Sequence, residues 1–294
     1  MKKVGFWLAK CAAYLIAITP FSLLYLKADI WYFLICHMVR YRRKVVRDNL
    51  VKSFPEKPVQ EIKRIEKRFY RNFCDLVVEI CKSTRMKPED VLKHVTITNP
   101  ELLEDLYNKK KSVLLAMHHS SNWEWLWKVL FTTSSHRHFA VYKKLENPYF
   151  DRYIYQVRTS QSSDKEIMIQ DRMTTQRLDQ MKDSMNSVFI LGDQSPRGSE
   201  KDYWTEFLHR DTCWYRGVGK LAQMYGYAVV YVEMVREGRG LYKVTFKTIC
   251  EDPYSLSEDE IIEQYVRHVE RFIQDNPDNW LWSHRRWKHK KPQA

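Results

Sequence analysis

The chain has 294 residues, 44% of them hydrophobic, which is enough to bury the core of one large domain with an appendage. Its formal charge of +13 would attract an anionic partner such as nucleic acid, an acidic protein or an anionic membrane. Charge alone does not identify which of these binds, and a merely solvated basic surface is the alternative. Six scattered cysteines without a Cys-x-x-Cys pair argue against a disulfide scaffold and a zinc site, and they fit a reducing compartment.

The first predicted element is an apolar N-terminal helix. Residues 4–26 carry only Lys10 as a charge, and a run of about 23 residues can cross a hydrocarbon layer of ~30 Å. A second apolar run, residues 30–39, is too short to span. A secretory signal would be shorter and would end at a small-residue cleavage site. We therefore predict membrane contact, with a buried core helix as the alternative because Lys10 and Pro20 interrupt the run.

Two basic clusters account for much of the positive charge. The first directly follows the apolar runs, which predicts that the rest of the chain lies on the cytoplasmic side of a membrane. We divide the chain into a membrane anchor with a basic juxtamembrane segment, residues 1–45, and an α/β domain, residues 46–294. The clusters comprise Arg40, Arg42, Arg43, Lys44 and Arg47, and then Arg285, Arg286, Lys288, Lys290 and Lys291.

Strand and helix patterns alternate through the rest of the chain. A helix over residues 59–81 and a short one opened by Pro88 come first. The alternation predicts an α/β fold with a mostly parallel sheet flanked by helices and a hairpin turn at residues 237–240. The predicted strands are residues 112–117, 138–142, 187–191, 228–233 and 242–248, and the predicted helices are residues 123–131, 148–158, 174–183, 215–224 and 258–274.

The segment VLLAMHHSSNWEWLW, residues 113–127, contains the candidate catalytic residues. An apolar strand delivers His119, and Glu124 follows five positions later. An imidazole can take a proton from a hydroxyl near neutral pH, and a carboxylate on its other nitrogen fixes the tautomer. We predict His119 as a general base oriented by Glu124, without a covalent enzyme intermediate.

The same segment also has a structural interpretation. Ser120, Ser121 and Asn122 are all good N-cap residues, so the segment could simply open a helix. We assign His118 to packing or capping. We expect no metal, because no His-Glu-x-x-His motif or cysteine pair accompanies the histidines.

Two predicted strands end in polar residues that we expect to face one cleft. The strand at residues 112–117 precedes His118 and His119, and the strand at residues 187–191 precedes Gly192, Asp193 and Gln194. In open α/β sheets, chemistry gathers at the carboxyl ends of the strands. With eight glycines and no glycine-rich loop, the chain lacks a nucleotide-binding fingerprint.

Four blocks of the sequence carry polar and aromatic residues in a distinctive order. They are His119-Ser120-Ser121-Asn122-Trp123-Glu124; Val141-Tyr142-Lys143 with Asn147-Pro148 and Arg158; Gly192-Asp193-Gln194 with Trp204, Phe207 and Leu208; and Trp280-Leu281-Trp282-Ser283-His284-Arg285-Arg286-Trp287-Lys288. In this order the blocks resemble the bacterial lipid A biosynthesis acyltransferases, and the first is similar to that family's His-x4-Asp/Glu motif. The likeness extends from the N-terminal segment to about residue 290.

The resemblance implies a glycerol-3-phosphate acyltransferase-like fold and an enzyme of the bacterial inner membrane, with no cofactor. Such an enzyme moves a fatty acyl group from acyl carrier protein, or a related thioester, onto a hydroxyl of a lipid A precursor. His119 and Glu124 would be catalytic. Arg158, Asn122, Asp193 and Gln194 would bind substrate or stabilise the oxyanion, and Arg285, Arg286 and Lys288 would dock the donor or lipid phosphates.

Two alternatives remain open from the sequence. The acceptor can be another lipid, such as an aminoacyl lipid or a phosphatidylinositol mannoside. The family's common Phe-Gly after the histidine is replaced by Ser120-Ser121, and bulky residues at Cys213-Trp214-Tyr215-Arg216 put acceptor identity and acyl-chain length in doubt. A different class, a membrane-associated protein that binds nucleic acid without catalysis, would use the chain's 10 Trp and 18 Tyr as stacking platforms. Because these aromatics lie mostly in periodic segments, we expect core packing instead and no nucleic acid.

Overall fold

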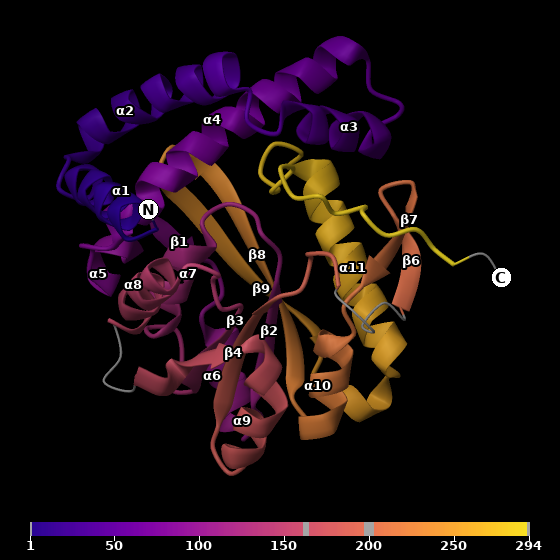
Figure 1. Cartoon of the computed structure of the whole chain (residues 1–294). Helices are drawn as coiled ribbons and strands as arrows, with labels where there is room; N and C mark the ends of the chain where they lie inside the picture. Colours follow the sequence, from indigo (N-terminus) through magenta and orange to yellow (C-terminus); the bar gives the residue numbers. More distant parts are fainter. Residues whose placement is uncertain (1, 161–164, 197–202, 293–294) are drawn as a thin grey trace.

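The computed structural model describes residues 2–160, 165–196 and 203–292. Within these residues the structure contains a seven-stranded sheet surrounded by helices (Figure 1). Its strand order is β1-β9-β8-β2-β5-β3-β4. Every neighbouring pair is parallel except β8 and β9, which form an antiparallel hairpin. The predicted α/β fold with a mostly parallel sheet and a hairpin at residues 237–240 is therefore confirmed. The strands are β1 Val95–Ile97, β2 Val113–Met117, β3 Arg137–Tyr142, β4 Met168–Gln170, β5 Asn186–Leu191, β8 Ala228–Gly238 and β9 Leu241–Cys250.

Helices cover both faces of this sheet, because its central strands are apolar on both sides. All five residues of β2 are buried. Leu114 and Ala116 belong to one hydrophobic cluster, and Val113, Leu115 and Met117 belong to the other. The first cluster contains residues of α3 Arg43–Ser53, α4 Val59–Ser83, α9 Thr174–Gln180, α10 Gly217–Tyr225 and α11 Glu258–Asp275; the second contains residues of α5 Pro88–Leu92, α6 Glu101–Asn108 and α7 Trp123–Leu130, with Tyr155 of α8 Pro148–Thr159 packed against it.

Several short elements carry no pattern that predicts them. The edge strands β1 and β4 have three residues each, too few to show an alternation. A separate antiparallel pair, β6 Tyr203–Phe207 and β7 Arg210–Trp214, lies outside the main sheet. Trp214 at the end of β7 is completely buried and packs edge-on against Tyr265 of α11. The bulky Cys213-Trp214 sequence therefore contributes to the core in this protein.

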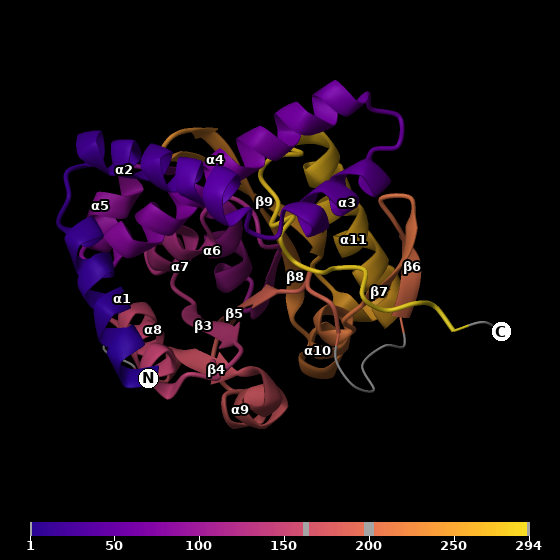
Figure 2. The ribbon, with the colours of Figure 1, turned by 45° about the horizontal axis from the view of Figure 1, so that its top comes forward.

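The N-terminal apolar segment differs from the single helix expected over residues 4–26. It forms α1 Lys2–Ala17, α2 Phe21–Phe33 and a π-helical turn, η1 Leu34–Val39. Pro20 separates α1 from α2 because proline lacks the N–H that a continuous helix requires. By length and composition, the helix that could cross a membrane is Phe21–Val39. In both views α2 runs beside α4 (Figures 1 and 2).

A buried histidine in β3 gives the fold a predictable dependence on pH. Burial lowers the pKa of His138 to about 4, with a smaller contribution from His136. Because the pKa of His138 in the folded protein lies below the ordinary ~6.5, the unfolded chain binds the proton more readily. The contribution of the neutral ring to the free energy of unfolding is therefore complete above pH ~6.5 and is lost as pH falls toward ~4. We expect His138→Phe to reduce the fall in the free energy of unfolding between about pH 7 and about pH 5 by ~1–2 kcal/mol.

Denaturant titrations of the detergent-solubilised protein at the two pH values measure this difference. His209→Asn is the matched control, because His209 is exposed and asparagine tolerates its φ of +62°. If His138→Phe and the parent protein lose the same stability on acidification, His138 does not contribute to the pH dependence.

Candidate active site

The predicted cleft forms where β2 and β5 end side by side. The two strands are parallel neighbours, with Met117 opposite Leu191 in the register. The N–H of Gly192 donates to the carbonyl of Met117 over 3.1 Å, which joins the two loops that follow the strands. A Cβ at Gly192 would lie 3.2 Å from the hydroxyl oxygen of Tyr265, so glycine permits this close approach. The expectation that His119 and Asp193 face one site is confirmed.

Asp193 is the carboxylate that holds the His119 ring. Its Oδ1 lies 2.6 Å from His119 Nδ1, and its Oδ2 accepts a hydrogen bond from Trp280 Nε1 at 2.8 Å. The Asp193 side chain is 2% exposed and that of His119 is 16% exposed. His119 Nδ1 is therefore fixed inside the protein, while part of the ring remains accessible to solvent. The expected orientation of His119 by Glu124 is corrected: Asp193 takes that place.

The electrostatics of Asp193 favour a charged carboxylate. Burial alone would raise its pKa, but the charge and hydrogen bond of His119, the nearby His118 and the bond from Trp280 outweigh burial. The pKa of Asp193 consequently lies well below its usual range. An ionised carboxylate can only accept a hydrogen bond, so the proton of the neutral ring is on Nδ1. The lone pair of His119 is then on Nε2.

The second ring nitrogen of His119 meets Gln194. The Gln194 side-chain Nε2 lies 3.2 Å from His119 Nε2, so the amide donates to the lone pair. Gln194 is exposed, so its amide can move away from this place. A substrate hydroxyl that displaces the amide would find the lone pair of Nε2 ready to accept its proton.

Glu124 instead forms an ion pair with Arg158. Both carboxylate oxygens accept from the guanidinium, with Glu124 Oε2 3.0 Å from Arg158 Nε and Oε1 bonded to Nη2. Glu124 lies in the first turn of α7, one position beyond Trp123, whose ring is 5.2 Å from that of His119. Trp127 Nε1 also donates to the carbonyl of Arg158 at 3.0 Å. The pair holds one guanidinium, 25% exposed, against the helix that begins at the site loop.

Asn122 caps a helix inside the protein and does not line the site. It is completely buried and is the N-cap of α7, with its side-chain oxygen accepting from Trp125 N at 3.1 Å. Its amide donates to Glu79 Oε2 at 3.0 Å. Because both polar groups are bonded inside the protein, Asn122 is not available to bind substrate, which corrects the assignment made from its motif.

His118 is packed into the core, as expected. The ring is fully buried, stacks on Tyr231 with 5.8 Å between centroids and meets Phe272 edge-on at 4.4 Å. Burial lowers the pKa of His118 to about 4, more than the charge of Asp193 raises it. A neutral, enclosed imidazole cannot exchange protons with a substrate.

The C-terminal segment closes over the two loops. Leu281 N donates to the carbonyl of His119 at 3.0 Å, and Ser121 N donates to the carbonyl of Asn279 at 3.2 Å. Arg286 is buried, 1% exposed, with its guanidinium 4.5 Å above the Trp214 ring. Of the three predicted docking residues, only Arg285 and Lys288 are exposed. Arg286 therefore does not belong to a docking surface, and its contribution is to packing.

A narrow, partly open pocket adjoins His119. Its apolar lining comes largely from α4, through Phe69, Phe73 and Leu76, together with Trp123. The periodicity of residues 59–81 predicted this helix but gave no signal that connects it with the site. The polar lining comes from α4, the loop after His119, the hairpin strands β8 and β9 and the C-terminal segment, and it comprises Asn72, Ser121, Arg236, Tyr242, Asp278 and Asn279.

Comparison with known proteins identifies a family. A family model described as bacterial lipid A biosynthesis acyltransferase matches residues 1–289. No curated protein matches the chain.

Proposed function

The chain belongs to the bacterial lipid A biosynthesis acyltransferases and is therefore an acyltransferase, and we propose that it transfers a fatty acyl chain from acyl carrier protein, or a related thioester, to a hydroxyl of a lipid A precursor. The observation that supports this most strongly is the His119 ring, whose Nδ1 is bonded to the buried Asp193 and whose Nε2 meets the side-chain amide of the exposed Gln194. That arrangement suits a general base for a hydroxyl.

The proposed reaction proceeds by direct attack. His119 Nε2 takes the proton of the acceptor hydroxyl as its oxygen forms a bond to the thioester carbonyl carbon. Asp193 stabilises the imidazolium that results. The tetrahedral intermediate then expels the thiolate as the carbon–sulfur bond breaks, and the imidazolium returns the proton to that sulfur. The products are the ester and the free thiol, so atoms and charge balance.

The negative charge that develops on the carbonyl oxygen needs a donor. The Arg158 guanidinium, held by Glu124, has the charge to stabilise that oxyanion or an acceptor phosphate. The Gln194 amide, once displaced from Nε2 by the acceptor hydroxyl, can donate a hydrogen bond to the same oxyanion. In this proposal Glu124 acts on Arg158 and not on the histidine.

The proposed location is the inner membrane, with the α/β domain on the cytoplasmic side, where the donor thioester is present. Membrane association is supported by the family and by the apolar helix Phe21–Val39. The pocket beside His119 has an apolar wall on α4, which is the kind of surface that an acyl chain contacts.

Mass spectrometry of total lipids from a deletion strain, with and without the gene restored, tests the proposal. We expect lipid A that lacks one acyl chain in the deletion strain, and its return on complementation. If lipid A is unchanged and an aminoacyl lipid or a phosphatidylinositol mannoside lacks one chain, that lipid is the acceptor. The proposed reaction would then stand with a different acceptor. Unchanged lipids together with tight binding of single-stranded RNA would overturn the proposal.

Reversal of the two exposed charges tests donor docking. Acyl carrier proteins are acidic, so Arg285→Glu with Lys288→Glu is expected to raise the apparent KM for the donor several-fold, most strongly at low salt. Steady-state kinetics at two ionic strengths measure the effect. The matched control reverses Lys182 and Lys220, which are also exposed. An equal response of both variants would contradict docking at the C-terminal cluster.

A further inference from the structure

We infer that α1, α2 and η1, residues 2–39, form an in-plane docking platform that lies in the cytoplasmic leaflet beside the α/β domain and does not span the bilayer. The length and composition of Phe21–Val39 alone would permit a span. What decides against it is how the segment is attached to the domain.

The inner side of the platform packs against α4. Leu24 and Ala28 of α2 are completely buried and form a cluster with Cys74 and Val78 of α4. Ile16 of α1 belongs to the same cluster. At the other end of α1, Phe6 lies between the aromatic rings of α8, stacked on Tyr149 and edge-on to Phe150. Both helices therefore lie along the surface of the domain.

The outer side of the platform is an apolar surface without a protein partner among the described residues. Only 11% of the Phe21–Val39 window is buried. A soluble monomer rarely exposes so many large apolar side chains together. The exposed residues are Trp7, Leu8, Leu15, Ile18, Leu23, Leu26, Ile30, Trp31, Phe33, Leu34, Met38 and Val39.

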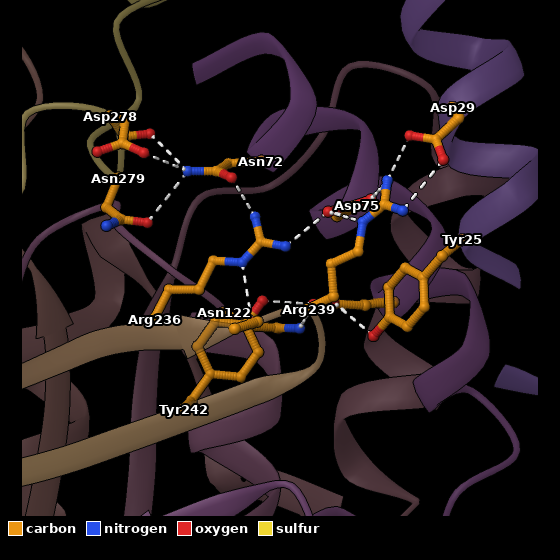
Figure 3. A network of polar contacts seen from close by, with 12 residues as sticks. Tyr25, Asp29, Asn72, Asp75, Asn122, Arg236, Arg239, Tyr242, Asp278 and Asn279 are labelled. Carbon is orange, nitrogen blue, oxygen red and sulfur yellow. Dashed lines mark hydrogen bonds and ion pairs between the residues drawn. The ribbon is translucent and has the colours of Figure 1, made fainter. Parts of the chain in front are cut away.

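One charged and one polar side chain of the candidate span, Asp29 and Tyr25, bind the α/β domain (Figure 3). Both carboxylate oxygens of Asp29 accept from Arg239, at 3.0 Å and 2.5 Å, and Arg239 also bonds to the buried Asp75 of α4. Tyr25 donates to Glu79 Oε1 at 3.1 Å. A spanning orientation would break these contacts and leave Asp29 within the hydrocarbon, at a cost of ~2.5–3.5 kcal/mol for a central charge.

The C-terminal end of the platform has the charge that an anionic leaflet attracts. Arg40 and Arg42, both exposed, have positive φ values of 52° and 48°, so the chain reverses there and enters α3. Lys44 is exposed in the same turn. Each such cation near an anionic leaflet contributes ~1 kcal/mol of attraction. Cations beside an apolar surface strengthen its attachment to an interface that contains anionic lipid.

The platform also leads to the pocket beside His119. Tyr41, two residues after η1, stacks on Phe73, which lines that pocket, with 5.9 Å between the ring centroids. Arg236 lines it too and bonds to Asn72 and to Asp75, the carboxylate that Arg239 shares. If the proposed acyl transfer is correct, a lipid acceptor reaches the site without leaving the leaflet; the topology itself does not depend on that reaction.

Cysteine accessibility in the full-length protein tests the topology. Lys3→Cys and Lys44→Cys mark the two ends of the platform, and Tyr254→Cys, at a position where the native side chain is 70% exposed, marks the domain. Cys11, Cys36 and Cys81, the cysteines that are not buried, are first replaced by serine. A membrane-impermeant maleimide is applied to spheroplasts and to inside-out vesicles.

We expect all three variants to react in inside-out vesicles and none in intact spheroplasts. Reaction of the Lys3→Cys variant from the outside, with the Lys44→Cys variant reacting from the inside, would show that the segment spans and would overturn the inference. A protease site in an N-terminal tag gives a second measurement that does not depend on thiol reactivity. Cleavage only in inside-out vesicles supports the platform, and cleavage in spheroplasts contradicts it. Neither result depends on whether the acceptor is lipid A.

Discussion

Alanine at position 119 in place of His119 is expected to lower kcat for acyl transfer by ~10³- to 10⁴-fold, near the upper end of what general acid–base catalysis contributes. Without the imidazole, no group removes the hydroxyl proton as the carbon–oxygen bond forms. The affinity for either substrate should change little, because the ring contacts only the reacting oxygen. Initial rates with purified enzyme, a radiolabelled acyl donor and a lipid acceptor in mixed micelles measure the loss.

The control for this variant is His209→Asn, at an exposed histidine in the turn between β6 and β7. Thermal unfolding of both variants establishes that the fold is intact. Turnover of His119→Ala within tenfold of the parent would exclude His119 as the base and would leave the acyltransferase reaction to other residues.

Asp193→Asn is expected to lower kcat by a comparable ~10⁴-fold with a small change in KM. Asparagine offers Nδ1 an N–H donor in place of a carboxylate, so the ring takes the tautomer with its proton on Nε2. That nitrogen can then no longer accept the substrate proton. Asp193 is a positioning residue in this account, and its signature is a loss in kcat with the KM for the acceptor retained.

The same carboxylate predicts a change in stability with pH. The pKa of Asp193 in the folded protein lies below its unfolded value of ~3.9, so the stabilisation is present above pH ~4 and is lost as pH falls further. Asp193→Asn should be less stable than the parent near neutral pH, and the difference should shrink below pH ~4. Chemical denaturation across that range measures it; a constant difference would show that the charge of Asp193 does not stabilise the fold.

Much of the fold follows from local sequence patterns. The buried strands β2 and β5 are apolar runs bounded by polar residues, and their parallel alignment places the residues after Met117 and Leu191 together. His119 and Asp193 could therefore be expected in one cleft. The break at Pro20 is a local signal too, and it is the reason that one long apolar run forms α1 and α2.

The partner of His119 could not be derived in the same way. Asp193 lies 74 positions away in sequence, and its contact with Nδ1 depends on the alignment of two strands and on Trp280 from the C-terminal segment. Glu124 has the right chemistry and a short spacing, but the start of α7 directs it to Arg158. Spacing along the chain indicates the nearer carboxylate, and tertiary structure selects the farther one.

Burial divides residues that the sequence treats as equivalent. Arg285 and Arg286 are adjacent and equally charged, yet one is exposed and the other packs on Trp214. Asn122 has the same motif context as His119 but is fully enclosed by its bonds to Glu79 and the α7 backbone. Such differences depend on which side of a short segment faces the core. Irregular loops have no hydrophobic periodicity from which that side could be predicted.

The central claim, that Asp193 and not Glu124 holds the His119 ring, is tested most directly by imidazole NMR of protein labelled with ring-¹⁵N histidine. The account predicts a protonated Nδ1 with a strongly deshielded proton and an unprotonated Nε2 at His119, assigned by its absence in His119→Ala. That signal should disappear in Asp193→Asn and persist in Glu124→Gln. Its loss in Glu124→Gln together with its persistence in Asp193→Asn would contradict the account.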